Sequence, residues 1–304
     1  MPKLLAMVLA GALWLPAVAQ TRAALAGPDG ELPPSALTIR RVVPEVQMLF
    51  AAEDHRGRPV RGLSAPQIRV LDNGMAVPLT SLQAAAGMPL RLALLLDTSD
   101  SMRPGFAAAR QTALASLRRA QHSADDQIFA LSFAAGQEAG TGSNPAGALA
   151  TCRLGGQTAL YNALISAAGI LDSSTPARRV LLLLSDGEDN YSQSTLEEAV
   201  AALQRASVAV YAVTVHSSRL EYPGDRVLRQ LAAATGGRAF LLHSYAGFST
   251  VFGDMENDLR SQYLVGFRPL GSLAPEEFHA VKILPLTRGT LIRARAGYYV
   301  RSEK

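Results

Sequence analysis

Cysteine is nearly absent from the chain. Cys152 is the single cysteine in 304 residues, so no disulfide can form within one molecule and the hydrophobic core has to stabilise the fold by itself. A single cysteine can be a reactive thiol, but such residues more often serve as small buried side chains. We therefore expect Cys152 to lie in the core.

Runs of basic residues are also missing. Lys and Arg total 29 against 25 Asp and Glu, which gives a formal net charge of +4. A nucleic-acid-binding surface usually needs a cluster of basic charge, so the composition argues against a nucleic-acid partner. The densest basic stretches are three pairs, Arg40-Arg41, Arg118-Arg119 and Arg178-Arg179.

No apolar run after the N-terminus is long enough to cross a membrane. The N-terminal run, Leu4 to Leu15, follows one cationic residue and precedes the small-x-small triplet Ala17-Val-Ala19. This pattern predicts a signal peptide over residues 1–19. A membrane anchor is the alternative, but the run is shorter than the ~20 residues of a spanning helix and Pro16 interrupts it. We expect an exported protein, periplasmic or secreted, without a stable membrane span after cleavage.

Sequence motifs of catalysis are missing as well. There is no G-x-S-x-G elbow, no P-loop and no H-E-x-x-H. An aspartyl nucleophile at Asp97 would usually be followed by a second Asp two residues on, and position 99 is Ser. No general base adjoins an activated nucleophile, so we expect a protein that is not an enzyme. The histidines show no metal-binding spacing; they are His55, His122, His216, His243 and His279.

The composition, 48% apolar and 18% charged, is that of a globular protein with one or two domains. Residues 20–35 are rich in Ala, Gly and Pro and predict a flexible leader. Residues 36–87 contain strand-like runs separated by turn signals, at Asp54–Gly57 and Asp72–Gly74. The second turn signal follows "QIRVL", as a hairpin loop would. This segment predicts a small antiparallel β module.

The pattern changes at Leu90 to strands that alternate with helices. Strand runs such as Val180 to Leu184 are continuously apolar, which a parallel sheet covered on both faces requires. The alternation predicts an α/β domain with a doubly wound, mostly parallel sheet over 88–250. Ser194-x-x-Glu197 predicts a capping box at one helix start. The expected helices are Met102–Gln121, Ala159–Leu171, Thr195–Arg205 and Arg226–Ala234.

Residues 251–304 complete a helix and add short strand runs outside this alternation. The helix is expected around Phe248–Arg260, and the strand runs are "QYLVGFRP", "HAVKILPL" and "TLIRARAGYYV". The hypothesis is that these strands pack on the N-terminal β module, which makes one β unit interrupted by the α/β domain.

Polar side chains follow several strands of the predicted sheet. Asp97, Ser99 and Ser101 alternate after the first strand, Thr158 starts a helix after two glycines, and Asp186 ends another apolar strand. Ligands of doubly wound sheets bind at the carboxyl ends of the strands. Hydroxyl and carboxylate oxygens suit Mg²⁺, Mn²⁺ or Ca²⁺. Each residue alone could be a helix cap, but together they predict a metal site.

This arrangement resembles the von Willebrand factor A (integrin I-like) domain, whose metal-ion-dependent adhesion site is written D-x-S-x-S, then T, then D. Asp97, Ser99, Ser101, Thr158 and Asp186 match it. The strings "GGQTALYNAL", "SDGEDNYS" and "LRSQYLVGF" are similar to an exported bacterial branch of the family. The resemblance implies that the two serines bind the ion directly, and that the other three residues bind it directly or through water. Mg²⁺ is the expected ion.

By the same resemblance, one coordination position stays open for the acidic side chain of a protein partner. The implied function is a metal-dependent binding or adhesion module of the cell envelope. The alternative is a structural or assembly scaffold in which the metal is structural and the β module makes the contacts. Asp100 departs from the family pattern, which has Gly there. Its side chain either faces solvent or caps the next helix, or it adds negative charge beside the ion, as Glu188 and Asp189 also could.

Overall fold

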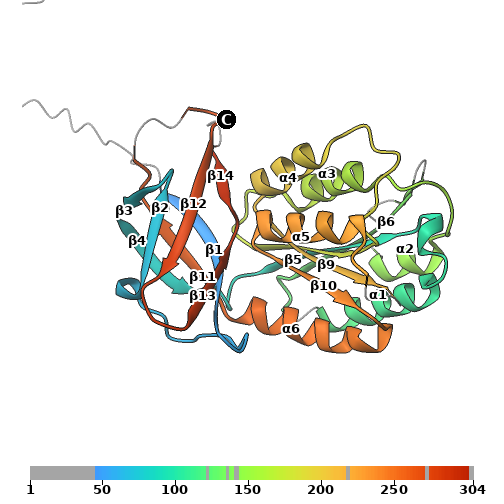
Figure 1. Ribbon diagram of the computed structural model, residues 1–304, viewed down its shortest axis with the longest axis horizontal. Coiled ribbons are helices and arrows are strands. Elements are labelled where there is room, and N and C mark those ends of the chain that lie inside the picture. Colours follow the sequence, from blue (N-terminus) through green and yellow to red (C-terminus); the bar gives the residue numbers. More distant parts are fainter. Residues whose placement is uncertain are drawn as a thin grey trace, which may run out of the picture. The chain divides into compact units, whose positions relative to one another are not determined.

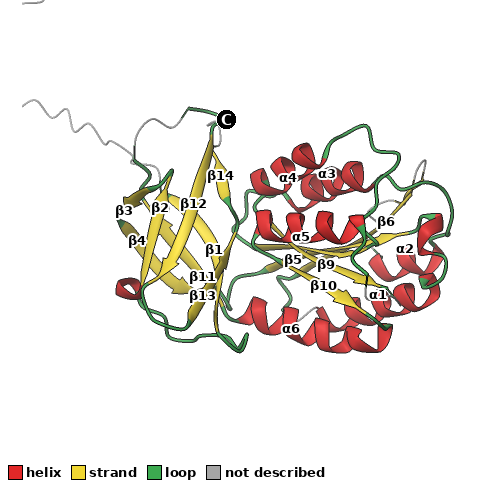
Figure 2. Ribbon diagram, viewed as in Figure 1, coloured by secondary structure: helices red, strands yellow, loops and turns green. Residues whose placement is uncertain are grey.

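The computed structural model describes residues 45–120, 123–134, 137–139, 144–216, 220–270 and 274–300. The predicted signal peptide and leader lie outside the described residues. Within them, no helix combines the length and the apolar character that a membrane span requires. Figures 1 and 2 show an α/β part and a part made of strands.

The α/β part is built on a six-stranded sheet in the order β10-β9-β8-β5-β6-β7. Every neighbouring pair is parallel except β6 and β7. Alternate residues of the central strand β5 face opposite sides, and both sides are buried, which explains its continuous apolar run. The strands are β5 (Leu90–Asp97), β6 (Gln127–Ala134), β7 (Gln137–Ala139), β8 (Arg178–Leu184), β9 (Val208–Val215) and β10 (Arg238–Leu242).

Helices cover both faces of this sheet (Figure 2). One core joins Leu92, Leu94 and Leu96 of β5 to side chains of α1, α2 and α6, and the other joins Ala93 and Leu95 to α3, α4 and α5. The prediction of a doubly wound α/β fold is confirmed. The helices are α1 (Phe106–Ala120), α2 (Pro145–Thr151), α3 (Leu160–Leu171), α4 (Leu196–Arg205), α5 (Pro223–Thr235) and α6 (Phe248–Arg260).

The capping box of α4 differs from the prediction by one residue. Thr195, not Ser194, accepts the hydrogen bond from the Glu198 backbone N–H, and the Glu198 carboxylate accepts one from the Thr195 N–H. The sequence "STLEE" satisfies the capping pattern in both registers, so the pattern alone could not select one. Ser194 instead donates its backbone N–H to Asn162 Oδ1.

The β module consists of two four-stranded antiparallel sheets, ordered β13-β1-β11-β4 and β14-β12-β2-β3. Each sheet combines strands from both ends of the described chain, which alternate in the first sheet and meet at the pairing of β12 with β2 in the second, and their apolar faces share one core. The predicted flanking β module from N- and C-terminal segments is confirmed. Its strands are β1 (Val46–Asp54), β2 (Ile68–Asp72), β3 (Met75–Val77), β4 (Leu79–Ala84), β11 (Gln262–Phe267), β12 (Phe278–Pro285), β13 (Thr290–Ala294) and β14 (Gly297–Tyr299).

A two-residue turn joins β2 to β3, as the sequence predicts. Asn73 and Gly74 have φ angles of 47° and 83°, and Asp72 pairs with Met75 across the turn. Positive φ at both central positions is the geometry that favours Asn-Gly in a tight hairpin. The Asn73 side chain also accepts the backbone N–H of Ala280 on β12, so the turn is held to the neighbouring strand.

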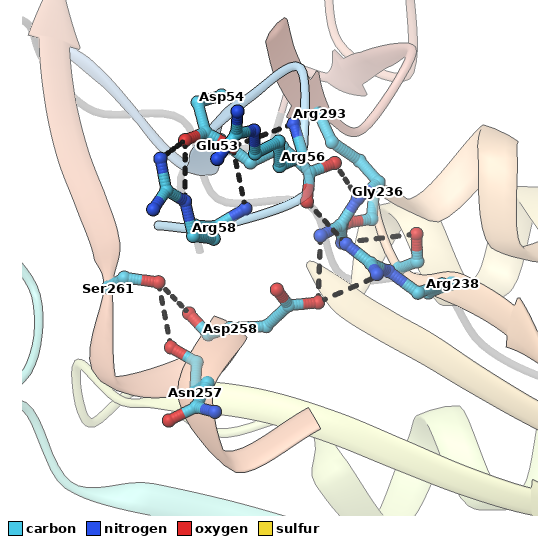
Figure 3. Close-up of polar contacts among 11 residues, drawn as sticks. Glu53, Asp54, Arg56, Arg58, Gly236, Arg238, Asn257, Asp258, Ser261 and Arg293 are labelled. Carbon is cyan, nitrogen blue, oxygen red and sulfur yellow. Dashed lines mark hydrogen bonds and ion pairs between the residues drawn. The ribbon is translucent and has the colours of Figure 1, made fainter. Parts of the chain in front are cut away.

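Two arginines and two acids link the β module to the α/β part (Figure 3). Arg293 of β13 donates to Asp258 of α6 at 2.7 Å, and Arg238 of β10 lies 3.5 Å from the same carboxylate. Arg238 also pairs with Glu53 of β1, while Arg293 Nη1 donates to the carbonyls of Gly236 and Gly237. These four side chains are mostly buried. We call Glu53, Arg238, Asp258 and Arg293 the ion-pair network.

Candidate metal centre

The carboxylate of Asp97 is the buried centre of the candidate site. Asp97 ends β5 and is 0% exposed. Its Oδ1 accepts hydrogen bonds from the Ser99 backbone N–H at 2.9 Å and from the Ser99 hydroxyl at 2.6 Å. Its Oδ2 accepts one from the Ser185 hydroxyl at 2.6 Å. The Oγ atoms of Ser99 and Ser101 are 3.0 Å apart, so these groups form one connected cluster.

The cluster is closed on one side and open on the other. Ser99 and Thr158 are buried, with 1% and 2% exposed, whereas Ser101 is exposed and Asp186 is half-buried. A cation bound here would therefore have protein oxygens beneath it and solvent above it. The side of the cluster that carries Ser101 and Asp186 is thus accessible to solvent, whereas Asp97, Ser99 and Thr158 are not.

Thr158 is placed by a loop that is strapped to the Asp97 segment. The backbone N–H of Gly155 donates to the Thr98 carbonyl at 2.8 Å, and that of Asp100 donates to the Gly156 carbonyl at 3.0 Å. Both glycines have positive φ, 147° and 95°, where a side chain would be strained. Thr158 lies two residues after Gly156, and α3 begins at Leu160, with Ala159 as its N-cap residue.

The loop after β8 holds Thr158 from its other side. Asn190 Oδ1 accepts the Thr158 backbone N–H at 2.8 Å, and the backbone N–H groups of Asn190 and Tyr191 donate to the Thr158 carbonyl. Asp189 Oδ2 accepts the Tyr161 N–H at 2.9 Å in the first turn of α3. A carboxylate at this position satisfies a free N–H and complements the helix dipole. Asp189 is thus a structural cap in this loop.

Asp186 lies in a turn that requires two glycines. A Cβ on Gly187 would lie 2.4 Å from the Gly224 carbonyl oxygen, and a Cβ on Gly224 would lie 2.0 Å from the Asp186 carbonyl oxygen. Gly187 also has a φ of 80°. The start of α5 therefore packs backbone to backbone against the loop after β8, which fixes the backbone position of Asp186.

Asp100 is engaged with the protein. Its carboxylate pairs with Arg103 and accepts the Gly156 backbone N–H at 3.2 Å. Its side chain is 58% exposed. The extra negative charge at this position thus has a positive neighbour, and the residue joins the two loops that carry Ser99 and Thr158.

The donor set fits a hard divalent cation. Of the described residues, no Lys, Arg or His forms an ion pair with Asp97 or Asp186, so the charge of the buried carboxylate lacks a protein counter-charge. Burial raises the pKa of Asp97 to about 6, against the opposing hydrogen bonds from Ser185 and Ser99. Hydroxyl and carboxylate oxygens are ligands for Mg²⁺, Mn²⁺ or Ca²⁺. The described residues contain no group of three or more His, Cys, Asp or Glu that could hold a metal ion, so the candidate site relies on hydroxyl groups beside its two carboxylates.

Sequence reasoning missed Ser185 and Asn190, and it considered Asp189 only as a negative charge beside the ion and not as the cap of α3. Ser185 contacts Asp97 directly, and Asn190 and Asp189 hold α3. Ser185 had a sequence signal, because it stands at the end of an apolar strand beside Asp186. Asn190 and Asp189 had none, since a polar loop gives no sign that its side chains reach a helix start. The structure connects Asp97, Ser99 and Ser101 directly and holds Thr158 and Asp186 through their loops.

The sequence matches the family model described as "VWA domain containing CoxE-like protein" over residues 72–244. The match spans more than half of the chain and includes all five candidate metal ligands. Comparison with curated proteins finds no significant match.

Comparison with solved structures finds similar chains at low sequence identity. A von Willebrand factor type A protein from Catenulispora acidiphila is 13% identical, with a TM-score of 0.50, covering 84% of this chain and 73% of that one. An aerotolerance-related membrane protein from Bacteroides fragilis is 15% identical, with a TM-score of 0.42, over 56% of this chain and 98% of that one. The pilus adhesin SpaC from Lactobacillus rhamnosus GG is 11% identical, with a TM-score of 0.44, over 83% and 47%.

Proposed function

Since the chain belongs to the von Willebrand factor A (VWA) domain family, we propose that it binds a protein partner through a divalent cation held by Asp97, Ser99, Ser101, Thr158 and Asp186. The cation is Mg²⁺, with Mn²⁺ and Ca²⁺ as alternatives, and the partner supplies an acidic side chain. The observation that carries the proposal is the buried Asp97 carboxylate, which accepts hydrogen bonds from two hydroxyl groups and which no basic side chain of the described residues neutralises.

The charge of the donor set explains why the partner's group is acidic. Two carboxylates and three hydroxyls are available to the ion. One of the carboxylates, that of Asp97, already accepts hydrogen bonds from the hydroxyls of Ser99 and Ser185. A divalent ion bound mainly by neutral oxygens keeps an affinity for an external carboxylate. The exposed hydroxyl of Ser101 lies on the side from which such a group can approach.

The proposal is for binding without turnover, in a protein exported by the predicted signal peptide to the periplasm or the outside of the cell. A hydrolase that uses the same ion is the opposing possibility. Metal-loaded protein is expected to leave p-nitrophenyl phosphate unhydrolysed; Mg²⁺-dependent release of nitrophenol that Asp186→Ala abolishes would contradict the binding proposal.

Partner capture is the direct test. Immobilised protein is incubated with an envelope extract of the source organism, in Mg²⁺ or in EDTA, with wild type and Ser101→Ala in parallel. We expect capture in Mg²⁺ alone, loss with the variant, and loss when carboxylates of the extract are first blocked by carbodiimide and glycinamide. A partner retained in EDTA and by the variant would contradict the proposal. That result would favour the scaffold alternative, in which the β module makes the contact.

The Asn190 side chain is expected to tune metal affinity without touching the ion. Asn190→Ala removes the acceptor of the Thr158 N–H, so the Thr158 hydroxyl loses its fixed position. Loss of such supporting contacts typically weakens metal binding about 10- to 100-fold. Isothermal titration with Mg²⁺ measures the change. Asn190→Asp, which keeps an acceptor oxygen, is the matched control and should not lose affinity; a wild-type affinity for Asn190→Ala would contradict the prediction.

A further inference from the structure

A groove opens beside the candidate metal centre and shares residues with it. Its volume is about 580 Å³, within the range of roughly 300–1,000 Å³ typical of ligand pockets. Ser101 and Asp186 line one end, and Glu188 lies with them. A ligand group in this groove is therefore next to any group bound to the metal, so the two positions can be occupied by one molecule.

The remaining lining of the groove combines apolar and aromatic side chains with the hydroxyl residues Thr214 and Ser244. Its apolar part comes from α1, the segment before α1, and the ends of β8 and β9, with Met102, Leu184 and Val213 among its members. Aromatic rings and imidazoles form much of the rest. They are His216, Tyr222, His243, Tyr245 and Phe248.

Two of the rings are held in fixed positions. His216 Nε2 lies 2.9 Å from Oδ1 of the buried Asp225, and its ring stacks on Tyr222 with centroids 4.3 Å apart. Tyr245 lies over Gly105, where a Cβ would approach its hydroxyl to 2.1 Å. Rings that already hold their positions lose less side-chain entropy when a ligand binds than mobile rings do.

The charges of the groove select a neutral occupant. No Lys or Arg is among its described lining residues, and the acids Asp186 and Glu188 lie at one end. Among the described lining residues, a second carboxylate on the ligand would find only His216, whose Nε2 already contacts Asp225, and His243 as basic groups. A basic group would be repelled by the bound divalent ion at that end, and would have to leave water for an apolar floor.

We propose that this groove receives a neutral aromatic side chain of the partner, from a polypeptide segment that also carries the acidic residue bound to the metal. The inference rests on the proposed function, because the acidic residue anchors the segment. The groove then provides selectivity between acidic segments: the ion binds any accessible carboxylate, whereas the rings of Tyr222 and Tyr245 favour a carboxylate with an aromatic neighbour.

Small carboxylates test the inference on the full-length chain. Acetate, hexanoate and 3-phenylpropionate are titrated in Mg²⁺ and in EDTA, with NMR signals of the Ser101 amide and of the Met102 and Val213 methyl groups as readouts. We expect 3-phenylpropionate to bind at least about tenfold more tightly than acetate, in Mg²⁺ alone. Tyr222→Ala should weaken it about three- to tenfold, the size of an aromatic contact. Phe278→Ala, which removes an exposed ring on β12, is the control and should change nothing.

Each other result has a defined meaning. If Mg²⁺ shifts the Ser101 signal but all three carboxylates bind equally, the groove inference is wrong and the metal proposal stands. Equal affinity for hexanoate and 3-phenylpropionate overturns the assignment of an aromatic occupant. Binding of 3-phenylpropionate that persists in EDTA shows that the groove and the metal are separate sites. If Mg²⁺ shifts no signal, the proposed function itself fails, and the inference with it.

Discussion

Asp97→Asn is expected to weaken Mg²⁺ binding more than about 100-fold. Mutation of a residue that only supports a metal ligand typically weakens metal binding about 10- to 100-fold, and a larger loss is expected for a proposed ligand. Asn keeps the shape of the side chain and an acceptor oxygen for the Ser99 N–H and hydroxyl, while its NH₂ group can donate to the Ser185 hydroxyl, which donates to Asp97 in the wild type. It removes the negative charge, which is the one charge of the site that is fully buried. The metal should therefore lose affinity for an electrostatic reason, while the surrounding loops keep their positions.

The same substitution should not destabilise the metal-free protein. Burial raises the pKa of Asp97 to about 6, which shows that the charged form is costly inside the fold when no cation is bound. Thermal unfolding in EDTA should give Asp97→Asn a Tm at or above that of wild type. In excess Mg²⁺ the order should reverse, because ligand at about 100 times its dissociation constant stabilises the wild type by about 2.7 kcal/mol.

Asp254→Asn makes the same change of charge at an exposed position on α6 and is the matched control. It should bind Mg²⁺ as wild type does in calorimetric titration. An Asp97→Asn variant that retains wild-type Mg²⁺ affinity would refute the assignment of Asp97 to the metal site. Failure of wild type itself to gain Tm with Mg²⁺, Mn²⁺ or Ca²⁺ would refute the metal site as a whole.

Arg293→Ala is expected to lower the free energy of unfolding by about 3–5 kcal/mol, the typical cost of leaving buried charges without a partner. Arg293 has 18% of its side chain exposed, and its partner Asp258 has 8%. The variant removes the 2.7 Å bond to Asp258 and both bonds to the carbonyls of Gly236 and Gly237. Burial already raises the pKa of Asp258 against the opposing arginines, so the loss of one arginine leaves a costly charge behind.

Denaturant titration followed by circular dichroism measures this effect. Arg293→Ala combined with Asp258→Ala should cost less than the sum of the two single changes, because the double variant leaves no unpaired charge between them. Arg260→Ala is the control on the same helix: its pair with Glu256 is exposed and spaced i,i+4, so about 0.3–0.5 kcal/mol is expected. A loss of unfolding free energy below about 1 kcal/mol for Arg293→Ala would contradict the prediction, because exposed ion pairs contribute as much.

The sequence was sufficient for the regular parts of the fold, because local patterns specify them. The apolar run ending at Leu184 became β8, and the helix predicted over Phe248–Arg260 has those bounds. Residues at strand ends were also readable, since parallel strands bring their carboxyl ends to one edge of a sheet. Asp97, Ser99 and Ser101 therefore stand together as expected.

Contacts between distant segments could not be read in the same way. Arg238 and Arg293 are ordinary arginines in the sequence, and only the packing of β10 and β13 brings both to Asp258. Asp100 is a similar case. The sequence shows that this residue departs from the family glycine, but it does not show that its carboxylate accepts the Gly156 N–H and pairs with Arg103. The α5 start was missed by three residues, because Pro223 was not recognised as its first residue.

The interleaved strands of the β module impose an order on folding during synthesis. β1 to β4 leave the ribosome first, yet Val46 pairs with Phe267 and Val70 pairs with Ile283. These pairings must wait until almost the whole chain has been made, whereas the α/β part has both of its cores between residues 90 and 260. Long-range pairing is slow and leaves early strand edges exposed. The α/β part is thus expected to fold first.

The pairing of Ala84 with Tyr263 places the entry to and exit from the α/β part side by side. A domain whose two ends lie side by side can fold as a unit, because neither end of the chain has to pass through the domain. Its completion then brings β4 and β11 together. The pairing of β4 with β11 therefore depends on the folding of the α/β part between them. Truncation of the chain before Gln262 should leave β1 and β4 without β11 and β2 without β12, so that only the pairing of β2 with β3 remains.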